Sequence, residues 1–220
     1  MRRGVVSEVF ATESAAQRYG DLLAGSPLHL VTERAAKALS DTVNPAGLVA
    51  VCSVPDTSLS DVLAGRPMLL AVPVGVSEPG NAGTLIRVAD AMGADAVVLA
   101  GHSVDPYNGK CLRASAGSIF SVPVVSESDG VGVVTQIRDA GLQVLATALD
   151  GDVSLDDAEL AVPTAWLFGP EAHGLPADLV DLATHRVHIP MRGGAESLNV
   201  ASAASICLYQ SAQAHRRIGG

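Results

Sequence analysis

The chain has 220 residues, of which 48% are hydrophobic and only 3% aromatic, and its net charge at neutral pH is −9. This length and hydrophobic content suffice for one medium domain, or for a small module attached to one. Taken alone, the acidic charge argues against a protein that coats nucleic acid non-specifically. A cluster of arginines assembled by the fold would not show in that total.

No apolar run is long enough to cross a bilayer, and the basic start, Met1 to Arg3, leads to Glu8 without the core of a signal peptide. We therefore expect a cytoplasmic protein with no membrane partner. Cys52, Cys111 and Cys207 are odd in number and widely spaced, with no C-x-x-C pair. This pattern predicts neither a disulfide framework nor a metal site, so we expect buried or idle thiols.

The first part of the chain has the pattern of a small α/β module. Apolar runs and capping residues predict a strand at 5–11, a helix opened by Thr12 and Ser14, a strand near 28–31, a helix started by Thr32 and Glu33, and a strand at 47–54. Proline and glycine then punctuate residues 55–67, where we expect the boundary. The sequence therefore predicts one domain over 1–60 and a second over 68–220.

The second domain alternates strand and helix patterns. Its strands are predicted at 68–74, 95–100, 121–125, 142–147, 164–168 and 186–189. Such alternation is typical of an α/β fold whose mostly parallel sheet is covered on both faces.

Common cofactor and hydrolase motifs do not fit this layout. The sequence GVGVVT at 130–135 resembles the start of a dinucleotide fingerprint, but Thr135 replaces the third glycine and residues 126–129 separate it from the preceding strand. Walker, H-E-x-x-H and nucleophile-elbow sequences are absent from the chain. These observations disfavour NAD-dependent, nucleotide-triphosphate and serine-hydrolase functions.

Two glycine-rich junctions in the last third of the chain are the strongest signs of a ligand site. LFGPEAHGLP at 167–176 and IPMRGGAESLNVASAASICLYQ at 189–210 each follow a short apolar run of strand type. In an open α/β sheet, ligands bind beyond the carboxyl ends of the strands, and glycines there let main-chain groups approach them closely. We therefore expect both junctions to bind a ligand.

A third candidate site opens the first helix of the second domain. Asn81 is positioned to cap this helix, whose predicted apolar face is formed by Leu85, Val88, Ala89 and Met92. Arg87 lies beside that face, where a lone arginine costs free energy unless an anion meets it. Two alternatives remain open from these residues, namely an ion pair with a nearby acid such as Asp90 and a clamp for a phosphate or carboxylate.

Four segments together resemble one protein family. NAGTLIRVADAMGADAVVL, RASAGSIFSVPV and the two glycine-rich junctions are similar, in that order, to the motifs of the SpoU/TrmH family of RNA 2′-O-ribose methyltransferases, which belongs to the SPOUT class. The resemblance covers about residues 68–215. It implies a parallel sheet with a trefoil knot at its carboxyl end, a feature that chain-pattern reasoning alone would have excluded because knots are so rare.

The resemblance also implies a cofactor, S-adenosylmethionine, and no metal. The methyl donor would be held mainly by backbone contacts around Thr147, Leu167, Gly169, Gly174, Ile189, Met191 and Leu198.

The expected catalytic residues follow from the same resemblance. Arginine is effectively always protonated, so we expect Arg87 to orient the substrate phosphate and stabilise the developing alkoxide, with the final proton acceptor left open. Asn81, Glu171, Ser197 and Asn199 match family positions near the methyl-transfer centre. Ser197 could equally cap the terminal helix, and Asn199 could satisfy its first turn.

The expected partners are RNA and a second copy of the chain. Arg113 and Ser115 match a motif that would contact RNA. By resemblance, a terminal helix at roughly 197–215 lies at a homodimer interface together with the knot. Periodicity alone does not establish this interface, because an Ala-rich helix is more often part of the core of its own domain.

The amino-terminal module resembles the small ribosomal-protein-like domain that many members place before the knot, here without the helix and strand that usually come first. This module favours 23S rRNA as the substrate, and a subgroup whose methylation confers thiostrepton resistance is compatible with the sequence. The alternatives are a tRNA 2′-O-methyltransferase and a non-catalytic RNA-binding or ribosome-assembly factor that kept the fold. An unrelated α/β small-molecule transferase retains little weight.

Overall fold

The computed structural model describes residues 5–55, 57–170 and 173–218. The chain divides into two compact units, Met1–Asp56 and Thr57–Gly220. The division falls at the start of the predicted linker at 55–67. The middle of that stretch is helix and not loop, because α4 (Leu59–Ala64) lies there and buries its first residue, Leu59, in the core of the second unit.

The first unit is a small α/β module made of helices and one β-sheet. Its elements in chain order are β1 (Val6–Ala11), α1 (Glu13–Arg18), α2 (Gly20–Leu23), β2 (Leu28–Leu30), α3 (Glu33–Ala38) and β3 (Leu48–Cys52). The strand order is β2-β1-β3, with β1 parallel to β2 and antiparallel to β3. Thr12 and Thr32 cap α1 and α3, each accepting a backbone N–H at 3.2 Å, so both predicted helix starts are confirmed.

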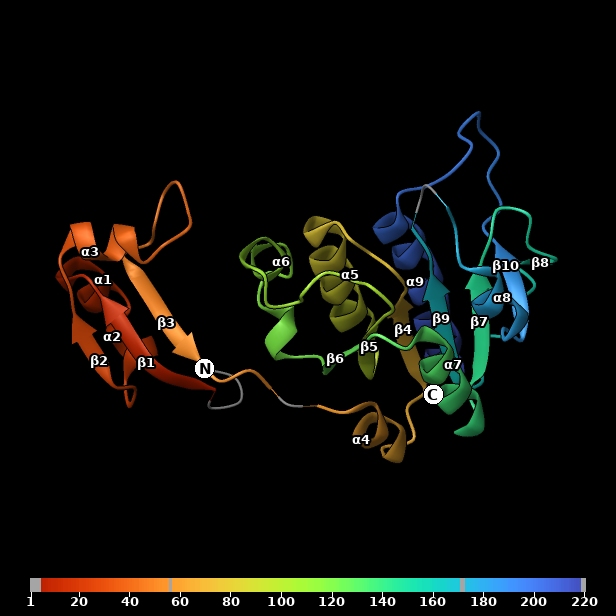
Figure 1. The fold of residues 1–220 in the computed structure, drawn as a ribbon, viewed down its shortest axis with the longest axis horizontal. Coiled ribbons are helices and arrows are strands. Elements are labelled where there is room, and N and C mark those ends of the chain that lie inside the picture. The colour runs from red at the N-terminus through yellow and green to blue at the C-terminus, as the bar shows by residue number, and fades with distance from the viewer. Residues whose placement is uncertain (1–4, 56, 171–172, 219–220) are drawn as a thin grey trace. The chain divides into compact units, whose positions relative to one another are not determined.

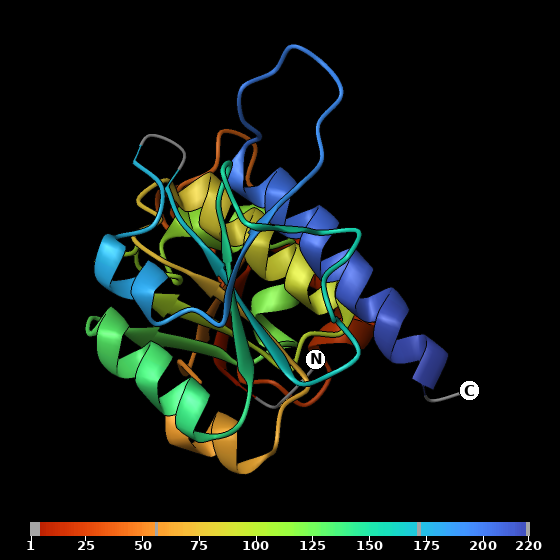
Figure 2. The same ribbon diagram turned by 90° about the vertical axis from the view of Figure 1, so that its right-hand side faces the viewer.

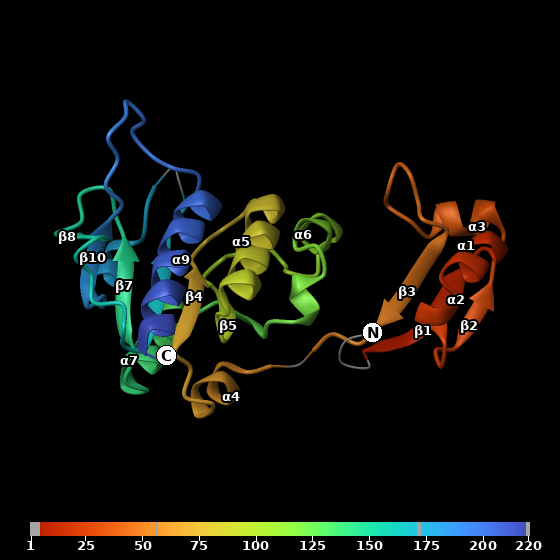
Figure 3. The same cartoon turned by 180° about the vertical axis from the view of Figure 1, so that it is seen from behind.

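The second unit is built on a parallel sheet, shown from opposite sides in Figures 1 and 3. Within the described residues this sheet has seven strands in the order β6-β5-β4-β9-β7-β10-β8, and every pairing is parallel. The strands are β4 (Leu69–Pro73), β5 (Ala96–Ala100), β6 (Val124–Glu127), β7 (Gln143–Thr147), β8 (Val153–Ser154), β9 (Thr164–Phe168) and β10 (His185–His188). Apart from the short β8, each corresponds to a predicted strand.

Helices cover both faces of this sheet. They are α4, α5 (Pro79–Met92), α6 (Gly109–Ala114), α7 (Gly130–Asp139), α8 (Ala177–Asp181) and α9 (Val200–Ile218). Successive residues of β4 alternate between two cores: Leu69 and Ala71 pack with α5, α6 and α9, whereas Leu70 and Val72 pack with α4, α7 and α8. The predicted two-sided burial is therefore confirmed.

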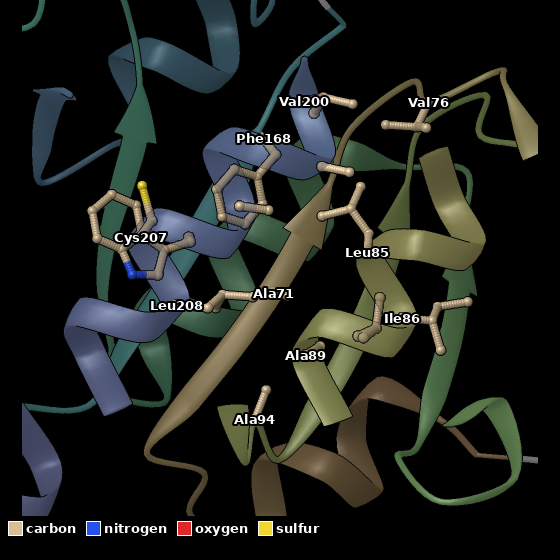
Figure 4. Packing of buried hydrophobic residues seen from close by; sticks show 14 of the residues in the cluster. Ala71, Val76, Leu85, Ile86, Ala89, Ala94, Phe168, Val200, Cys207 and Leu208 are labelled. Carbon is tan, nitrogen blue, oxygen red and sulfur yellow. The ribbon is translucent and has the colours of Figure 1, made fainter. Parts of the chain in front are cut away.

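The core between α5 and α9 is tightly filled. Figure 4 shows β4 between these two helices, with Leu85 and Leu208 among the side chains that meet there. Trp166 and Phe168 of β9 are completely buried in the same core, and their rings stack at a centroid distance of 6.3 Å. The indole N–H of Trp166 donates to Ser211 Oγ at 2.9 Å, which satisfies a buried polar group on each side.

One connection crosses directly over a strand. β7 and β8 lie on opposite sides of β10, yet only residues 148–152 join them. A parallel crossover usually takes a dozen residues or more, so this short one lies on the backbone of β10 itself. A Cβ atom at Gly151 would stand 2.7 Å from both His188 N and Val187 C, closer than Cβ atoms approach. Glycine is therefore required at the crossing.

The glycines of the sequence at 130–135 serve a helix start. Asp129 caps α7 by accepting the N–H of Gly132 at 2.9 Å, and a Cβ at Gly132 would lie 2.9 Å from Asp129 Cγ. The resemblance to a dinucleotide fingerprint thus has a local explanation in helix capping.

The three cysteines are free thiols. Burial raises the pKa of Cys207 to about 12, and burial together with Asp105 raises the pKa of Cys111 to about 11, so both thiols stay protonated at neutral pH. Within the described residues, no helix is both long and apolar enough to span a membrane, and no cluster of His, Cys, Asp or Glu could hold a metal ion.

Helix α6 packs against α5 at Gly83, and this contact gives a test of the fold. A Cβ at Gly83 would lie 2.6 Å from Ala114 Cβ and 3.0 Å from Ser115 N. We expect Gly83→Ala to lower the free energy of unfolding by about 1–3 kcal/mol, because α6 must move away from α5. Urea unfolding followed by circular dichroism measures this change.

Gly80 provides the matched control on the same helix. A Cβ at Gly80 meets nothing closer than Glu78 Oε1 at 3.4 Å, which is ordinary contact. Gly80→Ala should be neutral or stabilising by up to about 1 kcal/mol. Equal stability of the two variants would contradict the packing described for α5 and α6.

Candidate active site

A pocket opens at the carboxyl edge of the second sheet. It lies where β7, β9 and β10 end, and its walls are formed by Thr147, Ala148, Leu149, Gly169, Pro170, Gly174, Val187, Ile189, Met191, Ser197, Leu198, Val200 and Ala203. Because parallel strands end on the same edge, both glycine-rich junctions meet there, as the sequence predicted for a ligand site. The segment between β10 and α9, which supplies one wall, is the blue loop that projects in Figure 2.

The expected cofactor residues line this pocket with one exception. The six that do so are Thr147, Gly169, Gly174, Ile189, Met191 and Leu198. The exception, Leu167, is completely buried in β9, and its carbonyl accepts the hydroxyl of Thr147 at 2.9 Å. Leu167 thus orients a wall residue instead of forming the wall.

The glycines of the two junctions have different roles. A Cβ at Gly169 would stand 2.7 Å from both Gly174 C and Leu175 N, so the first junction folds back on itself only with glycine at 169. Gly174 has a φ of +66°, in the left-handed region. Gly193 and Gly194 are exposed, have open space around a Cβ, and are not among the pocket residues. The close contact at Gly169 and the positive φ of Gly174 therefore explain the glycines of the first junction, whereas Gly193 and Gly194 have no such explanation.

Two asparagines that are far apart in the sequence meet beside the pocket. The Nδ2 group of Asn199 donates to Asn81 Oδ1 at 3.1 Å, which joins the first turn of α5 to the start of α9. Asn199 Oδ1 accepts the N–H groups of Ala201 at 3.0 Å and Ser202 at 3.3 Å. Asn199 is therefore both the cap of α9 and one half of this amide pair.

Two capping expectations are wrong. The cap of α5 is Glu78, which accepts the N–H of Gly80, and Asn81 lies inside the helix where its side chain reaches Asn199. Ser197 precedes the first helical residue, Val200, by three positions and lines the pocket instead of capping α9. The side chain of Asn81 therefore lies beside the pocket and that of Ser197 lines it, and neither caps a helix.

Arg87 is separated from the pocket of its own chain. Its side chain is exposed on α5 and is not among the pocket residues. Because an α-helix has about 3.6 residues per turn, Arg87 and Asn81 point about 120° apart around the axis. Among the described residues, Arg87 forms no ion pair with Asp90 or with any other acid, so the ion-pair alternative for this arginine is not realised there. Glu171, another expected catalytic residue, lies outside the described residues.

The two expected RNA contacts differ sharply in exposure. Arg113 is exposed in the last turn of α6. Ser115 is completely buried and its hydroxyl donates to the carbonyl of Leu112 at 2.8 Å, so it supports the loop after α6 instead of presenting a group to RNA.

An ion pair that the sequence analysis missed ties α6 to the cap of α5. Lys110 Nζ contacts Glu78 Oε1, and this hydrogen bond, with a second from a backbone N–H, holds the pKa of Glu78 below its usual range. The capping carboxylate therefore stays ionised at neutral pH. No local pattern marks this pair, because its partners come from two different helices.

Several pocket residues were not predicted. They are Ala148, Leu149, Pro170, Val187, Val200 and Ala203. Ala148, Pro170 and Val200 are next to a predicted site residue in the sequence, and Leu149 and Val187 lie two positions from one. Ala203 lies one helical turn after Asn199. Extending each predicted contact along its strand or helix would have found them.

The fold and the pocket define an α/β protein with a small-molecule site at the carboxyl edge of a parallel sheet. Apolar side chains and main-chain edges form the walls, which suits a flat ring, and the asparagine pair offers hydrogen bonds beside it. Residues 68–209 match the SpoU rRNA methylase family, and the chain belongs to that family.

Named relatives agree with this membership. The chain is 35% identical over 206 residues to the 23S rRNA (guanosine(2553)-2′-O)-methyltransferase RlmP of Bacillus subtilis, covering 94% of this chain and 80% of that protein. It is 36% identical over 181 residues to the 23S rRNA (uridine(2479)-2′-O)-methyltransferase of Streptomyces viridochromogenes, covering 80% of this chain and 62% of that protein.

Solved structures share the fold. The SpoU methyltransferase AviRb from Streptomyces viridochromogenes, in complex with the cofactor AdoMet, superposes with a TM-score of 0.84 at 30% identity, covering 98% of this chain and 84% of that one. A structure on the 2-OH methylation of C/U34 on tRNA superposes with a TM-score of 0.62 at 29% identity, covering 71% of this chain and 99% of that one.

Asn199 gives a test of the amide pair and cap. We expect Asn199→Ala to lower the free energy of unfolding by about 1 kcal/mol, because α9 loses its cap. Asn199→Asp keeps an acceptor for the two N–H groups and should recover most of this loss. Both values come from urea unfolding, with the exposed Ser202→Ala as the control in the same helical turn. An alanine variant as stable as the wild type would contradict the capping role.

Proposed function

We propose that this protein transfers a methyl group from S-adenosylmethionine to a ribose 2′-hydroxyl of RNA, with 23S rRNA as the substrate. The observation that carries the proposal is the meeting of both glycine-rich junctions in one pocket beside Asn81 and Asn199. Membership of the SpoU family and the AdoMet complex of AviRb support it. We expect the reaction in the cytoplasm, where ribosomal RNA is present.

The pocket suits the proposed cofactor on its own chemistry. Ile189 and Leu198 offer an apolar slot for an adenine ring, and Gly169 and Gly174 bring main-chain atoms to the pocket wall without a side chain. Thr147 orients the end of β7 through its bond to the Leu167 carbonyl. When bound, S-adenosylmethionine supplies a sulfonium methyl group as the electrophile.

The polar residues around the pocket divide the remaining work. Asn81 and Asn199 fix one another at the pocket edge, and the exposed hydroxyl of Ser197 faces the same space. Arg87 would hold a substrate phosphate and stabilise the developing alkoxide, and Glu171 would help to fix the position of Arg87. The proton acceptor stays open in this proposal.

A second copy of the chain would complete the site. Arg87 does not reach the pocket of its own chain, which supports a homodimer whose active site draws residues from both chains. Helix α9 exposes Ile206 and Tyr209, 37% and 48% exposed respectively, three residues apart on one side. We propose this side of α9, with the carboxyl part of the sheet, as the dimer interface.

The carboxyl part of the sheet fits the trefoil knot of the family. β10 lies beneath the crossing segment 148–152 before the chain continues into α9, and α9 packs back against β4 and β9. This passage of one segment under another supports the knot. We also propose that residues 1–60 are a ribosomal-protein-like RNA-binding domain and that 68–220 are the methyltransferase domain.

Ribosomal RNA is favoured over tRNA by the extent of the similarity. The sequence alignment with the 23S rRNA methyltransferase RlmP covers 94% of this chain, whereas the superposition on the protein of the tRNA study covers 71%. An enzyme that shares almost the whole chain is the better guide to a substrate that the accessory unit helps to bind.

Arg87 gives the test of the activity. We expect Arg87→Ala to reduce methyl transfer from tritiated S-adenosylmethionine to 23S rRNA by at least about 100-fold, a typical cost of removing a group that stabilises transition-state charge. Arg138→Ala, an exposed arginine of α7, should retain the wild-type rate. Transfer to tRNA but not rRNA would favour the tRNA alternative.

An unchanged rate in Arg87→Ala would refute the proposed mechanism. If the wild-type dimer binds RNA but gives no heat with S-adenosylmethionine in calorimetry, the protein is a non-catalytic RNA-binding factor. If the protein is active, mapping of 2′-O-methylated positions in rRNA from cells with and without it identifies the nucleotide that it methylates.

The proposed dimer has its own test. We expect Ile206→Glu with Tyr209→Glu to shift the protein from dimer to monomer in analytical ultracentrifugation, because two carboxylates would be desolvated at the interface. The circular dichroism spectrum should be retained, since both side chains are exposed in the single chain. A wild-type protein that sediments as a monomer would overturn the interface and the shared site together.

A further inference from the structure

Arg186 ties the crossing segment to the strand beneath it. From β10, its Nη2 group donates to the main-chain oxygen of Asp150 at 2.5 Å and lies 3.3 Å from Asp150 Oδ2, and its Nε lies 3.7 Å from Asp152 Oδ1. One guanidinium group therefore holds residues on both sides of Gly151, the glycine that touches β10. The planar fork of arginine suits such multiple contacts.

His188 adds a second tie between the same two segments. Its Nδ1 atom lies 2.9 Å from the main-chain oxygen of Gly151, and because a carbonyl only accepts, Nδ1 carries the proton. Two successive carbonyls of the crossing segment, at 150 and 151, are thus bound by side chains of β10.

Both bound segments continue into walls of the pocket. Ala148 and Leu149 come directly before the tied residues, and Ile189 comes directly after His188, and all three line the pocket. The N–H of Ala148 also donates to the carbonyl of Val187 at 3.0 Å. The separation between these two walls is therefore set by contacts between 148–152 and 186–188.

We propose that Arg186, assisted by His188, is a positioning residue for the cofactor: it holds the Ala148–Leu149 wall against the Ile189 wall in the geometry that binds S-adenosylmethionine. This inference rests on the proposed function. Arg186 does not line the pocket and acts only through the segment that it holds.

The hydrogen bonds to main-chain oxygens carry this effect more than the ion pairs do. The side chains of Asp150 and Asp152 are 82% and 64% exposed, so solvent screens their attraction to Arg186. The crossing segment is too short for a helix and lies outside the strands, so without these ties its carbonyls would turn to water. A looser segment would have to be ordered again when the cofactor binds, which lowers affinity.

Calorimetric titration with S-adenosylhomocysteine tests the proposal without any RNA substrate. We expect Arg186→Met to raise the Kd about three- to tenfold, with binding stoichiometry unchanged, because each folded molecule still has a pocket with a misplaced wall. Arg138→Met removes the same charge from α7 and should keep the wild-type Kd. Arg186→Lys, which retains a donor but not the fork, should give an intermediate Kd.

The outcomes separate positioning from a structural role and from the proposed function. A wild-type Kd in Arg186→Met would overturn the inference. A lowered stoichiometry at an unchanged Kd would also overturn it, since this would mean only a smaller folded fraction. A wild-type protein that does not bind S-adenosylhomocysteine would instead refute the proposed function.

A second variant covers the case in which Arg186→Met does not fold. Asp150→Ala with Asp152→Ala leaves β10 intact and removes the carboxylates that orient the guanidinium group. This double variant should raise the Kd about two- to threefold and increase hydrogen exchange of the amides at 148–152. Unchanged exchange and an unchanged Kd in this double variant, together with a wild-type Kd in Arg186→Lys, would overturn the role of Arg186.

Discussion

The contact between the crossing segment 148–152 and the backbone of β10 is the constraint on which the site depends. Because β10 lies between β7 and β8, a connection of five residues has no route except across this strand, and Gly151 is the residue that permits it. The crossing brings the end of β7 to the end of β10. Gly169, directly after β9, closes the remaining side, so close backbone contacts at two glycines, Gly151 and Gly169, assemble three walls of the pocket.

The helices on one face of the sheet combine packing with chemistry. Leu85 and Ile86 of α5 are completely buried, while Arg87, the next residue, is exposed. The amide bond between Asn81 and Asn199 links α5 to α9 at the pocket edge, and the buried core between these helices fixes the two asparagines in place. A rigid scaffold of this kind gives hydrogen-bonding groups a defined position before any ligand arrives.

Local signals in the sequence predicted most elements but few of the contacts between them. Strands that are buried on both faces appear in the sequence as short apolar runs. Thr12 and Thr32 predicted the starts of their helices because capping is a local interaction. The family motifs pointed to residues of the pocket, but a motif carries no information on the exposure of a side chain. Ser115 was therefore expected to contact RNA and is buried. The Asn81–Asn199 bond spans 118 positions, and neither local pattern nor periodicity reports on such a contact.

The exposed arginines of the second unit show how an acidic protein can act on RNA. Within the described part of the chain, Arg87 and Arg113 are exposed and have no carboxylate partner, whereas Arg186 is paired with Asp150 and Asp152. A cation without a protein partner keeps its full charge for a phosphate, and one that is already paired contributes little. The net charge of −9 therefore says less about RNA than the pairing state of each arginine does. The arginines assigned to substrate are among those that the fold leaves unneutralised, whereas the arginine assigned to positioning is neutralised. Among the described residues Arg138 is also exposed and unpaired, so an unpaired charge is a condition for the substrate role and does not by itself assign it.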